Sequence, residues 1–178
     1  MYQKILNFWF EEITPAQWWK KDDAFDALLV ERFLGLHGQA SLGELFAWRT
    51  SPEGRLAEII LLDQFSRNMF RDTPAAFATD PMSLTLSQEA VACGADQALT
   101  SAQRNFLYMP YMHSESLLIH EVAVELFGNN GNQSTLEFEL KHKRIIERFG
   151  RYPHRNKILG RESTAEEIEF LAGPGSSF

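Results

Sequence analysis

Polar side chains recur at four-residue spacing in an otherwise apolar stretch of the sequence. Asp63 and Arg67 are four residues apart, as are Gln64 and Asn68, so in a helix each pair shares a face. The run Ile-Ile-Leu-Leu at residues 59 to 62 predicts that this helix, from about residue 52 to 71, is central and buried. Buried polar groups must be paired. The pattern therefore fits either a structural ion pair that fixes how helices cross, or a carboxylate and a guanidinium facing a pocket.

A second group with chemical potential is His113-Ser114-Glu115, at the predicted start of a helix that runs to about residue 127. Ser114 suits the N-cap of this helix and Glu115 suits the positive end of its dipole, so both have a structural interpretation. His113 has none. Because histidine titrates near neutral pH, His113 is a candidate for proton transfer, with Asp63 or Glu115 as the carboxylate that orients it.

A third group is rich in hydrogen-bond donors and surrounds Gly150, which ends a helix predicted from residue 134 to 149. Its members are His142, Arg148, Arg151, His154, Arg155 and Asn156. His142 shares an apolar stripe with Phe138 and Ile145 and is expected to point toward the core. Many donors with few acceptors suit a phosphate or carboxylate ligand. They suit buried carbonyl groups or the terminal carboxylate of Phe178 equally well.

The charge of the chain is unevenly distributed. The net charge is -7, yet residues 141–161 hold eight Lys and Arg and one Glu, so 8 − 1 gives +7 there and the remainder sums to -14. Such a segment binds a discrete anion or pairs with the carboxylates of its own chain. The overall acidity argues against nucleic acid as a partner.

Several common classes of site are absent from the sequence. There is no Gly-rich phosphate loop, no GxSxG and no paired CxxC, and His120-Glu121 is followed by Val124 where a zinc-protease helix needs His. We therefore expect no metal and no cofactor. Cys93 is the single cysteine, which fits a reducing compartment. No apolar run approaches the ~18 residues that cross a membrane, so we expect a cytoplasmic protein without a membrane partner.

The elements that must position these residues are helices. Alternating strand patterns are almost absent, and helix starts and stops are frequent. The predicted starts are Thr14-Pro15, Asp22, Ser51-Pro52, Asp80-Pro81, Ser101, Ser114, Ser134 with Glu137, and Thr164 with Glu167; the predicted stops include Gly94, Pro110, Gly128 and Gly150. No linker interrupts residues 1–178, which we interpret as one all-α domain.

The chain resembles an uncharacterised, largely bacterial family known as domain of unknown function 924. The resemblance is carried by LLDQFSRNMFR, FATDPMSLTLS, RNFLYMPYMHSES, IIERFGRYPHRNKILGREST and the final PGSSF, from about residue 56 to the end, with NFWF near the start. It implies a tetratricopeptide-like stack of antiparallel helix pairs, and it brings no activity or catalytic residues. Ser66 and Tyr152 stand where the family pattern has Pro and Phe; Ser66 should make its helix more regular.

Three functions remain open at the level of sequence. The first is a pocket for a small anionic ligand, lined by Arg67, Arg148, Arg151 and Arg155, with His113, His142 or His154 as proton carriers. The second is a protein-interaction module that binds an acidic peptide or partner helix, anchored by Trp18, Trp19 or Trp48. The third is a purely structural role for every cluster. The shared pocket requires Arg67 and Arg155 to converge, and the sequence does not indicate an oligomeric state.

Overall fold

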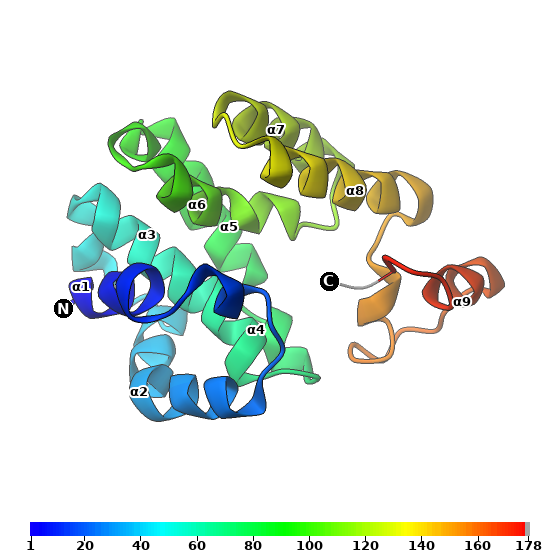
Figure 1. The fold of residues 1–178 in the computed structure, drawn as a ribbon, viewed down its shortest axis with the longest axis horizontal. Helices are drawn as coiled ribbons and strands as arrows, with labels where there is room; N and C mark the ends of the chain where they lie inside the picture. Colours follow the sequence, from blue (N-terminus) through cyan, green and yellow to red (C-terminus); the bar gives the residue numbers. More distant parts are fainter. Residues whose placement is uncertain (177–178) are drawn as a thin grey trace.

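The computed structural model describes residues 1–176, and these form a single all-helical domain without β-strands (Figure 1). Thr14 precedes the 3₁₀ turn Pro15–Trp18 as predicted, and its amide and hydroxyl donate to Oε1 of Gln17. The N-terminal elements are α1 (Gln3–Asn7) with a π-helical turn Phe8–Glu12, the 3₁₀ turn Pro15–Trp18, and α2 (Asp23–Ser41).

The buried centre of the fold is the helical run that carries Asp63. Ser51 caps α3 (Pro52–Ile60) by accepting a hydrogen bond from the Gly54 amide, and Pro52 occupies the first turn as predicted. The run continues through a π-helical turn (Leu61–Phe65) into α4 (Ser66–Met69). Elements on several sides contact α3, including α1, α5 and α6. The aliphatic run therefore forms the core, and the polar residues that follow it are held rigidly.

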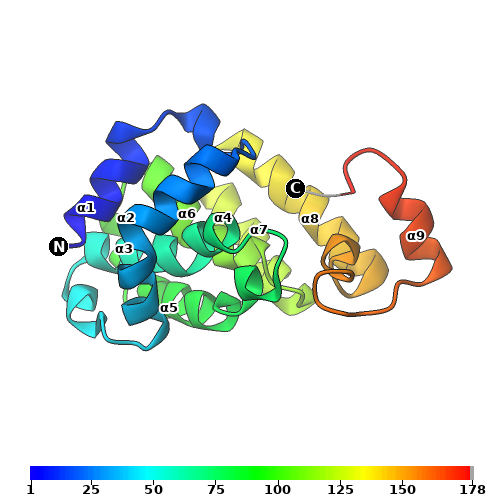
Figure 2. The ribbon, with the colours of Figure 1, turned by 90° about the horizontal axis from the view of Figure 1, so that it is seen from below.

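The second half of the chain folds back on itself in successive helices. These are α5 (Asp80–Ala92), α6 (Ser101–Met112), α7 (Leu117–Asn129) and α8 (Gln133–Phe149), and each of them contacts the next. The short connection between α7 and α8 makes them antiparallel neighbours (Figures 1 and 2). This pairing is compatible with a tetratricopeptide-like stack, which stays a prediction.

The C-terminal segment is attached at the end of α8. Gly150 takes a left-handed conformation, with φ of 68°, and ends α8 as predicted. The 3₁₀ turn Pro153–Arg155 follows, and then α9 (Ala165–Leu171), capped by Thr164 and Glu167 as the sequence indicates. Figure 2 shows α9 at the edge of the molecule, away from α1 to α4. Tyr152 and Arg155 instead reach back toward the centre.

Several boundaries differ from the predictions. The cap of α6 is Thr100 rather than Ser101, and that of α8 is Asn132 rather than Ser134, because each side chain accepts a hydrogen bond from the amide three residues on. Helix α6 continues through Pro110, since its packing against α3, α5 and α7 outweighs one missing backbone hydrogen bond. Helix α2 also extends to Ser41, five residues beyond the expected end at Leu36.

The start of α7 is the boundary that matters for function. Ser114 does not cap this helix; the residue before its first turn is Ser116, whose amide donates to the Ser114 hydroxyl. Helix α7 also runs through Gly128, the expected stop, to Asn129. The segment His113-Ser114-Glu115 is therefore a turn between α6 and α7. Its side chains are placed by the surrounding helices and not by a helix dipole.

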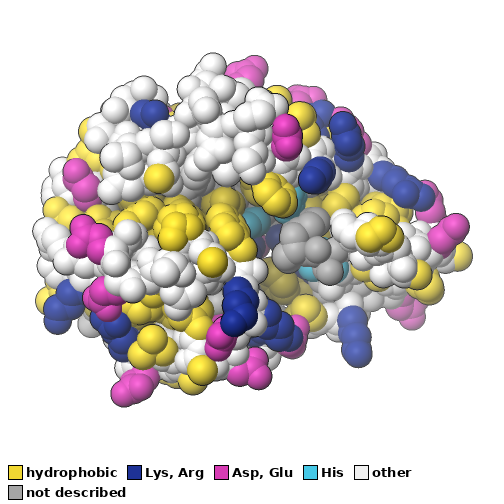
Figure 3. All heavy atoms as spheres, in the orientation of Figure 1, with side chains coloured by type: hydrophobic (Ala, Val, Ile, Leu, Met, Phe, Trp, Pro, Cys, Tyr) yellow, Lys and Arg dark blue, Asp and Glu magenta, His cyan; other side chains and the backbone are white. Residues whose placement is uncertain are grey.

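No helix in residues 1–176 is long and apolar enough to cross a membrane. The space-filling view shows histidine side chains within a hollow between the N-terminal helices and the C-terminal segment (Figure 3). The described part of the chain contains no cluster of three or more His, Cys, Asp or Glu arranged to hold a metal ion.

Candidate functional site

The position of Asp63 is set by the π-helical turn. This wider turn interrupts the regular helix that Ser66 was expected to favour, and the Ser66 hydroxyl compensates by donating to the Leu62 carbonyl at 2.7 Å. The Thr79 hydroxyl donates to the same oxygen at 2.6 Å. Asp63 is fully buried and accepts a hydrogen bond from Gln64 Nε2 at 2.5 Å.

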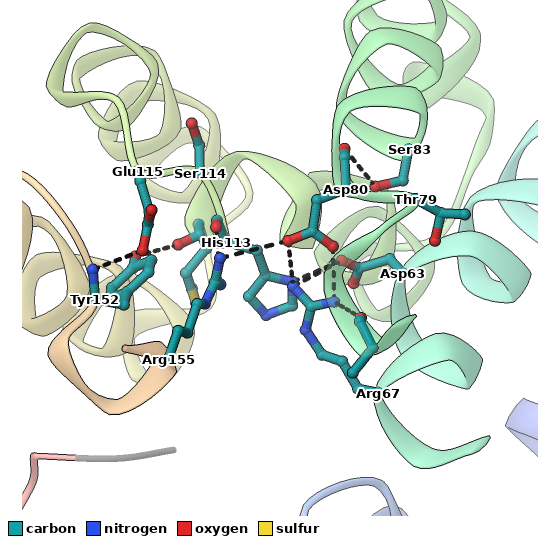
Figure 4. Close-up of polar contacts among 12 residues, drawn as sticks. Asp63, Arg67, Thr79, Asp80, Ser83, His113, Ser114, Glu115, Tyr152 and Arg155 are labelled. Atoms are coloured by element: carbon teal, nitrogen blue, oxygen red, sulfur yellow. Dashed lines mark hydrogen bonds and ion pairs between the residues drawn. The ribbon is translucent and has the colours of Figure 1, made fainter. Parts of the chain in front are cut away.

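Asp63 and His113 form a pair across 50 residues of sequence. The Oδ1 atom of Asp63 lies 2.7 Å from Nδ1 of His113, and the His113 side chain is 15% exposed (Figure 4). Asp63, not Glu115, is thus the carboxylate that orients a histidine. No residue in the described part of the chain forms a hydrogen bond with Nε2 of His113.

The charges around this pair determine its protonation. Burial alone would raise the pKa of Asp63, but the charges of His113 and Arg67 outweigh it and lower that pKa to about 2. Burial lowers the pKa of His113 below its ordinary value, while the Asp63 carboxylate opposes this shift. At neutral pH the carboxylate is ionised and the imidazole is neutral. An ionised carboxylate only accepts, so Nδ1 carries the proton and Nε2 carries the lone pair.

Asp80 joins Arg67 and Arg155, which come from distant parts of the chain. Arg67 donates to both carboxylate oxygens of Asp80, at 2.8 and 3.0 Å, and to the Ala76 carbonyl at 3.0 Å. Arg155 approaches the same carboxylate at 3.4 Å (Figure 4). Arg67 also lies 3.7 Å from Asp63. The two arginines therefore converge, which the idea of a shared pocket requires.

Arg155 keeps hydrogen-bonding capacity in reserve. Besides Asp80 it donates to the His113 carbonyl at 2.9 Å, and its Nε has no hydrogen-bond partner among the described residues. A guanidinium has five N–H donors, so partners for most of them are missing. The group lies 4.7 Å from the ring centre of Phe77 and 4.6 Å from that of Tyr152. Burial and the charge of Arg67 lower the pKa of Arg155 to about 10, which still leaves it charged at neutral pH.

A pocket of about 380 Å³ opens beside these groups. Its polar lining comes from Asp80, His113, Ser114, Glu115 and Arg155. The remaining lining residues are apolar: Pro74, Phe77, Ala78, Pro81, Leu84, Pro110 and Leu159. The arrangement offers a lone pair on an oriented imidazole and unused guanidinium donors, beside walls that suit an organic ligand.

Glu115 lines the pocket but is already paired. Arg161 binds both of its oxygens, at 2.6 and 2.9 Å, and the Tyr152 amide donates to it at 2.8 Å. Burial would raise the pKa of Glu115, and these partners lower it below its ordinary value. Glu115 therefore fixes the C-terminal segment to the turn before α7.

Other candidates serve the fold in their observed positions. Arg148 pairs with Glu166 at 2.8 Å and Arg151 with Glu167 at 2.7 Å, beside α9 and outside the pocket lining. The Glu167 carboxylate also accepts a hydrogen bond from the Thr164 amide at the start of α9. Of the four arginines expected to form a clamp, Arg155 lines the pocket, and Arg67 is linked to it through Asp80 without lining the pocket.

The amide candidates are also engaged. Asn68 donates to Asp26 at 2.8 Å, and Asn156 donates to the Ser163 hydroxyl at 3.1 Å. Gln64 donates to Asp63, as described above. None of these amides is among the residues that line the pocket.

His142 and His154 surround Tyr152, with ring centres 5.8 and 5.6 Å from it. His142 is 4% exposed, as its apolar stripe predicts. Burial lowers the pKa of His142 to about 3 and that of His154 to about 4, so both imidazoles are neutral at neutral pH. The suggested partner for this region, the carboxylate of Phe178, lies outside the described residues.

Four residues of the site were not predicted from the sequence: Asp80, Arg161, Phe77 and Tyr152. Asp80 was interpreted only as a helix start. A signal was present, because Arg67 and Arg155 cannot share one buried site without a second carboxylate between them. Phe77 and Tyr152 carry no such signal, since aromatic side chains are ordinary core residues.

Two comparisons with known proteins find relatives of this chain. Residues 5–175 match the family described as "Bacterial protein of unknown function (DUF924)". The solved structure of the protein of unknown function ATU0120 from Agrobacterium tumefaciens is similar, with 40% sequence identity, a TM-score of 0.91 and 96% of each chain covered. A comparison with curated proteins finds no significant match. The chain therefore belongs to the DUF924 family of bacterial proteins of unknown function.

Proposed function

We propose that the pocket binds a small carboxylic acid and that His113 acts on it as a general base. The observation that carries this proposal is the Asp63–His113 pair. The fully buried, ionised carboxylate of Asp63 lies 2.7 Å from Nδ1 of His113 and fixes it. His113 lines the pocket, and its Nε2 lone pair has no hydrogen-bond partner among the described residues. An oriented neutral imidazole beside a ligand cavity is the arrangement that general-base catalysis requires.

The charge balance of the site disfavours a ligand with two negative charges. The charged side chains within and behind the pocket are Arg67, Arg155, Arg161, Asp63, Asp80 and Glu115. Three cations and three carboxylates cancel, so a phosphate dianion would meet as much repulsion as attraction. A carboxylate needs only the unused donors of Arg155, and the apolar walls accommodate its carbon skeleton.

The chemistry that this pair supports is reversible proton transfer. Nε2 of His113 takes a proton from a C–H or O–H group of the ligand, and the electron pair of that bond stays on the ligand. The resulting imidazolium is stabilised by Asp63 and returns the proton to the same or a neighbouring atom. A carbonyl next to the C–H group makes it acidic. The simplest probes with both features are 2-oxo acids such as 2-oxobutanoate.

The alternative functions have less support from the geometry. An acidic peptide would need free arginines, but Arg148, Arg151 and Arg161 pair with carboxylates of the same chain. Trp18 and Trp48 pack against the core, which leaves Trp19 as the exposed aromatic anchor. A purely structural network would use all the donors of Arg155, and several remain unused.

Binding of 2-oxobutanoate to the full-length protein, measured by NMR titration, tests the proposal. Replacing Arg155 by Gln removes the charge that the carboxylate needs, and we expect the affinity to fall about tenfold or more, corresponding to ~1.4 kcal/mol per factor of ten. Arg148→Gln is the matched control, because it removes an arginine paired with Glu166 outside the pocket. Its affinity should equal that of the wild type.

Equal losses in both variants would mean that the ligand responds to overall charge and would contradict a site at Arg155. Stronger binding of inorganic phosphate than of 2-oxobutanoate would contradict the choice of a carboxylate. Chemical shift changes centred on Trp19 rather than on His113 would favour the protein-interaction alternative.

A further inference from the structure

A second histidine–carboxylate pair lies behind the pocket. His120 on α7 and Glu139 on α8 are both fully buried, and Nδ1 of His120 is 2.6 Å from Oε1 of Glu139. The Oε2 atom of Glu139 has no hydrogen-bond partner among the described residues. Burying such a pair costs free energy of desolvation that a well-packed apolar pair would avoid. Its retention needs a reason other than stability.

The outer nitrogen of His120 is directed at the turn that carries His113. Nε2 lies 2.9 Å from the Ser114 carbonyl, and a carbonyl only accepts, so Nε2 carries a proton. The second proton is then shared between Nδ1 and Glu139, and the pair is neutral overall in either form. Burial raises the pKa of Glu139, which favours keeping that proton between the two groups. The ring of His120 is thus fixed from both sides.

Tyr152 extends the network to the other side of His113. Its hydroxyl donates to the Met112 carbonyl at 2.5 Å and lies 3.1 Å from Nε2 of His120, from which it accepts. The carbonyls before and after His113 are therefore both held by one hydrogen-bonded unit. The His113 carbonyl itself is held by Arg155. Three successive carbonyls of this turn are therefore bound by buried side chains.

We propose that His120 and Glu139 are positioning residues for His113. They fix the backbone at Met112 and Ser114 so that the His113 side chain meets Asp63 through Nδ1 and presents Nε2 to the pocket. The importance of this positioning for activity rests on the proposed function above. The positioning itself is a property of the unliganded protein and is measured without any ligand.

The test is ¹⁵N NMR of histidine-labelled protein, with His113 assigned from a His113→Gln variant. In the wild type we expect the Nδ1–H tautomer of His113 and a pKa below 6.5. His120→Phe removes the donor to Ser114 and frees the turn. We expect the tautomers of His113 to mix, because the hydrogen bond to Asp63 that fixes the proton on Nδ1 is weakened.

The control is Tyr108→Phe, which removes another buried hydrogen bond of α6, at 2.6 Å to Asp96, away from the turn. It should lower stability without changing the His113 signals. Glu139→Gln should preserve the wild-type tautomer of His113. The Gln amide donates to Nδ1 of His120, so Nε2 of His120 keeps its proton and still donates to the Ser114 carbonyl. If His120 has a purely structural role, His120→Phe and Tyr108→Phe will both lower stability and leave the His113 signals unchanged. That result would overturn the proposal.

If His120→Phe does not fold, Tyr152→Phe takes its place, since it removes only the hydroxyl that holds Met112. Mixed His113 tautomers in that variant support the positioning role, and an unchanged Nδ1–H tautomer contradicts it. Failure of 2-oxobutanoate to bind the wild type would affect the proposed function alone, because none of these measurements involves a ligand.

Discussion

The tautomer of His113 is set by one buried carboxylate. Asp63 has no exposure to solvent, and it lies within the π-helical turn. A π-helical turn often marks a functional position in a helix, since the wider turn costs backbone hydrogen bonds. Here Ser66 and Thr79 satisfy the affected Leu62 carbonyl.

Replacing Asp63 by Asn should lower the pKa of His113 further. The Asp63 charge raises that pKa against the effect of burial, so removing the charge leaves burial unopposed. The Asn oxygen still accepts from Nδ1, which preserves the tautomer. A pH titration of the His113 signals measures the shift. Asp96→Asn, which removes a buried carboxylate at Tyr108, should leave the pKa of His113 unchanged. A rise in the Asp63→Asn variant would show that the carboxylate does not face the imidazole.

Some of the site could be predicted from the sequence, residue by residue. Asp63, Arg67 and His113 were candidates because polar side chains on apolar faces must find partners. Their pairing was not predictable, because 50 residues separate Asp63 from His113 and the helix crossing decides the match. Arg148 and Arg151 had the same local pattern as Arg155. They differ only in the acidic residues of α9 that tertiary structure brings to them.

The helices were the most predictable elements, and their ends were less so. Pro52 after Ser51, Gly150, and the pair Thr164 with Glu167 each act as their local chemistry indicates. The predictions at Pro110 and Ser114 were wrong for the same reason. Tertiary contacts of α6 extend this helix past Pro110, and α7 therefore begins later, at Leu117. The turn that carries His113 was hidden by that error.

At the scale of the helices, replacing Gly150 and Gly128 by Ala should change the free energy of unfolding in opposite directions. At Gly150 the left-handed φ of 68° strains any other residue, so Gly150→Ala should lower the free energy of unfolding by about 1 kcal/mol. Gly128 lies inside α7 with no atom near an added Cβ, so Gly128→Ala should raise it by about 0.5–1 kcal/mol. Urea unfolding of both variants measures the difference. Equal effects would mean that α8 does not end at Gly150 in solution.

At the scale of the whole molecule, the basic segment is partly neutralised by carboxylates of the same chain. Residues 141–161 carry +7, and their arginines bind Asp80, Glu115, Glu166 and Glu167. Most of these pairs join the segment after Gly150 to the rest of the fold. The sequence analysis left this pairing open beside anion binding. Four arginines of the segment pair with carboxylates of the same chain, and among these Arg155 lines the pocket and keeps unused donors.

The most direct test of the central claim is hydrogen–deuterium exchange at C3 of 2-oxobutanoate in D₂O, followed by ¹H NMR. The wild type should accelerate exchange over buffer. The rate should rise with pH to a plateau, with a midpoint below 6.5, because the base is neutral His113 with a lowered pKa. His113→Gln should lose the acceleration and Arg148→Gln should keep it. Exchange that is equally fast with His113→Gln and wild type would contradict a general base at His113.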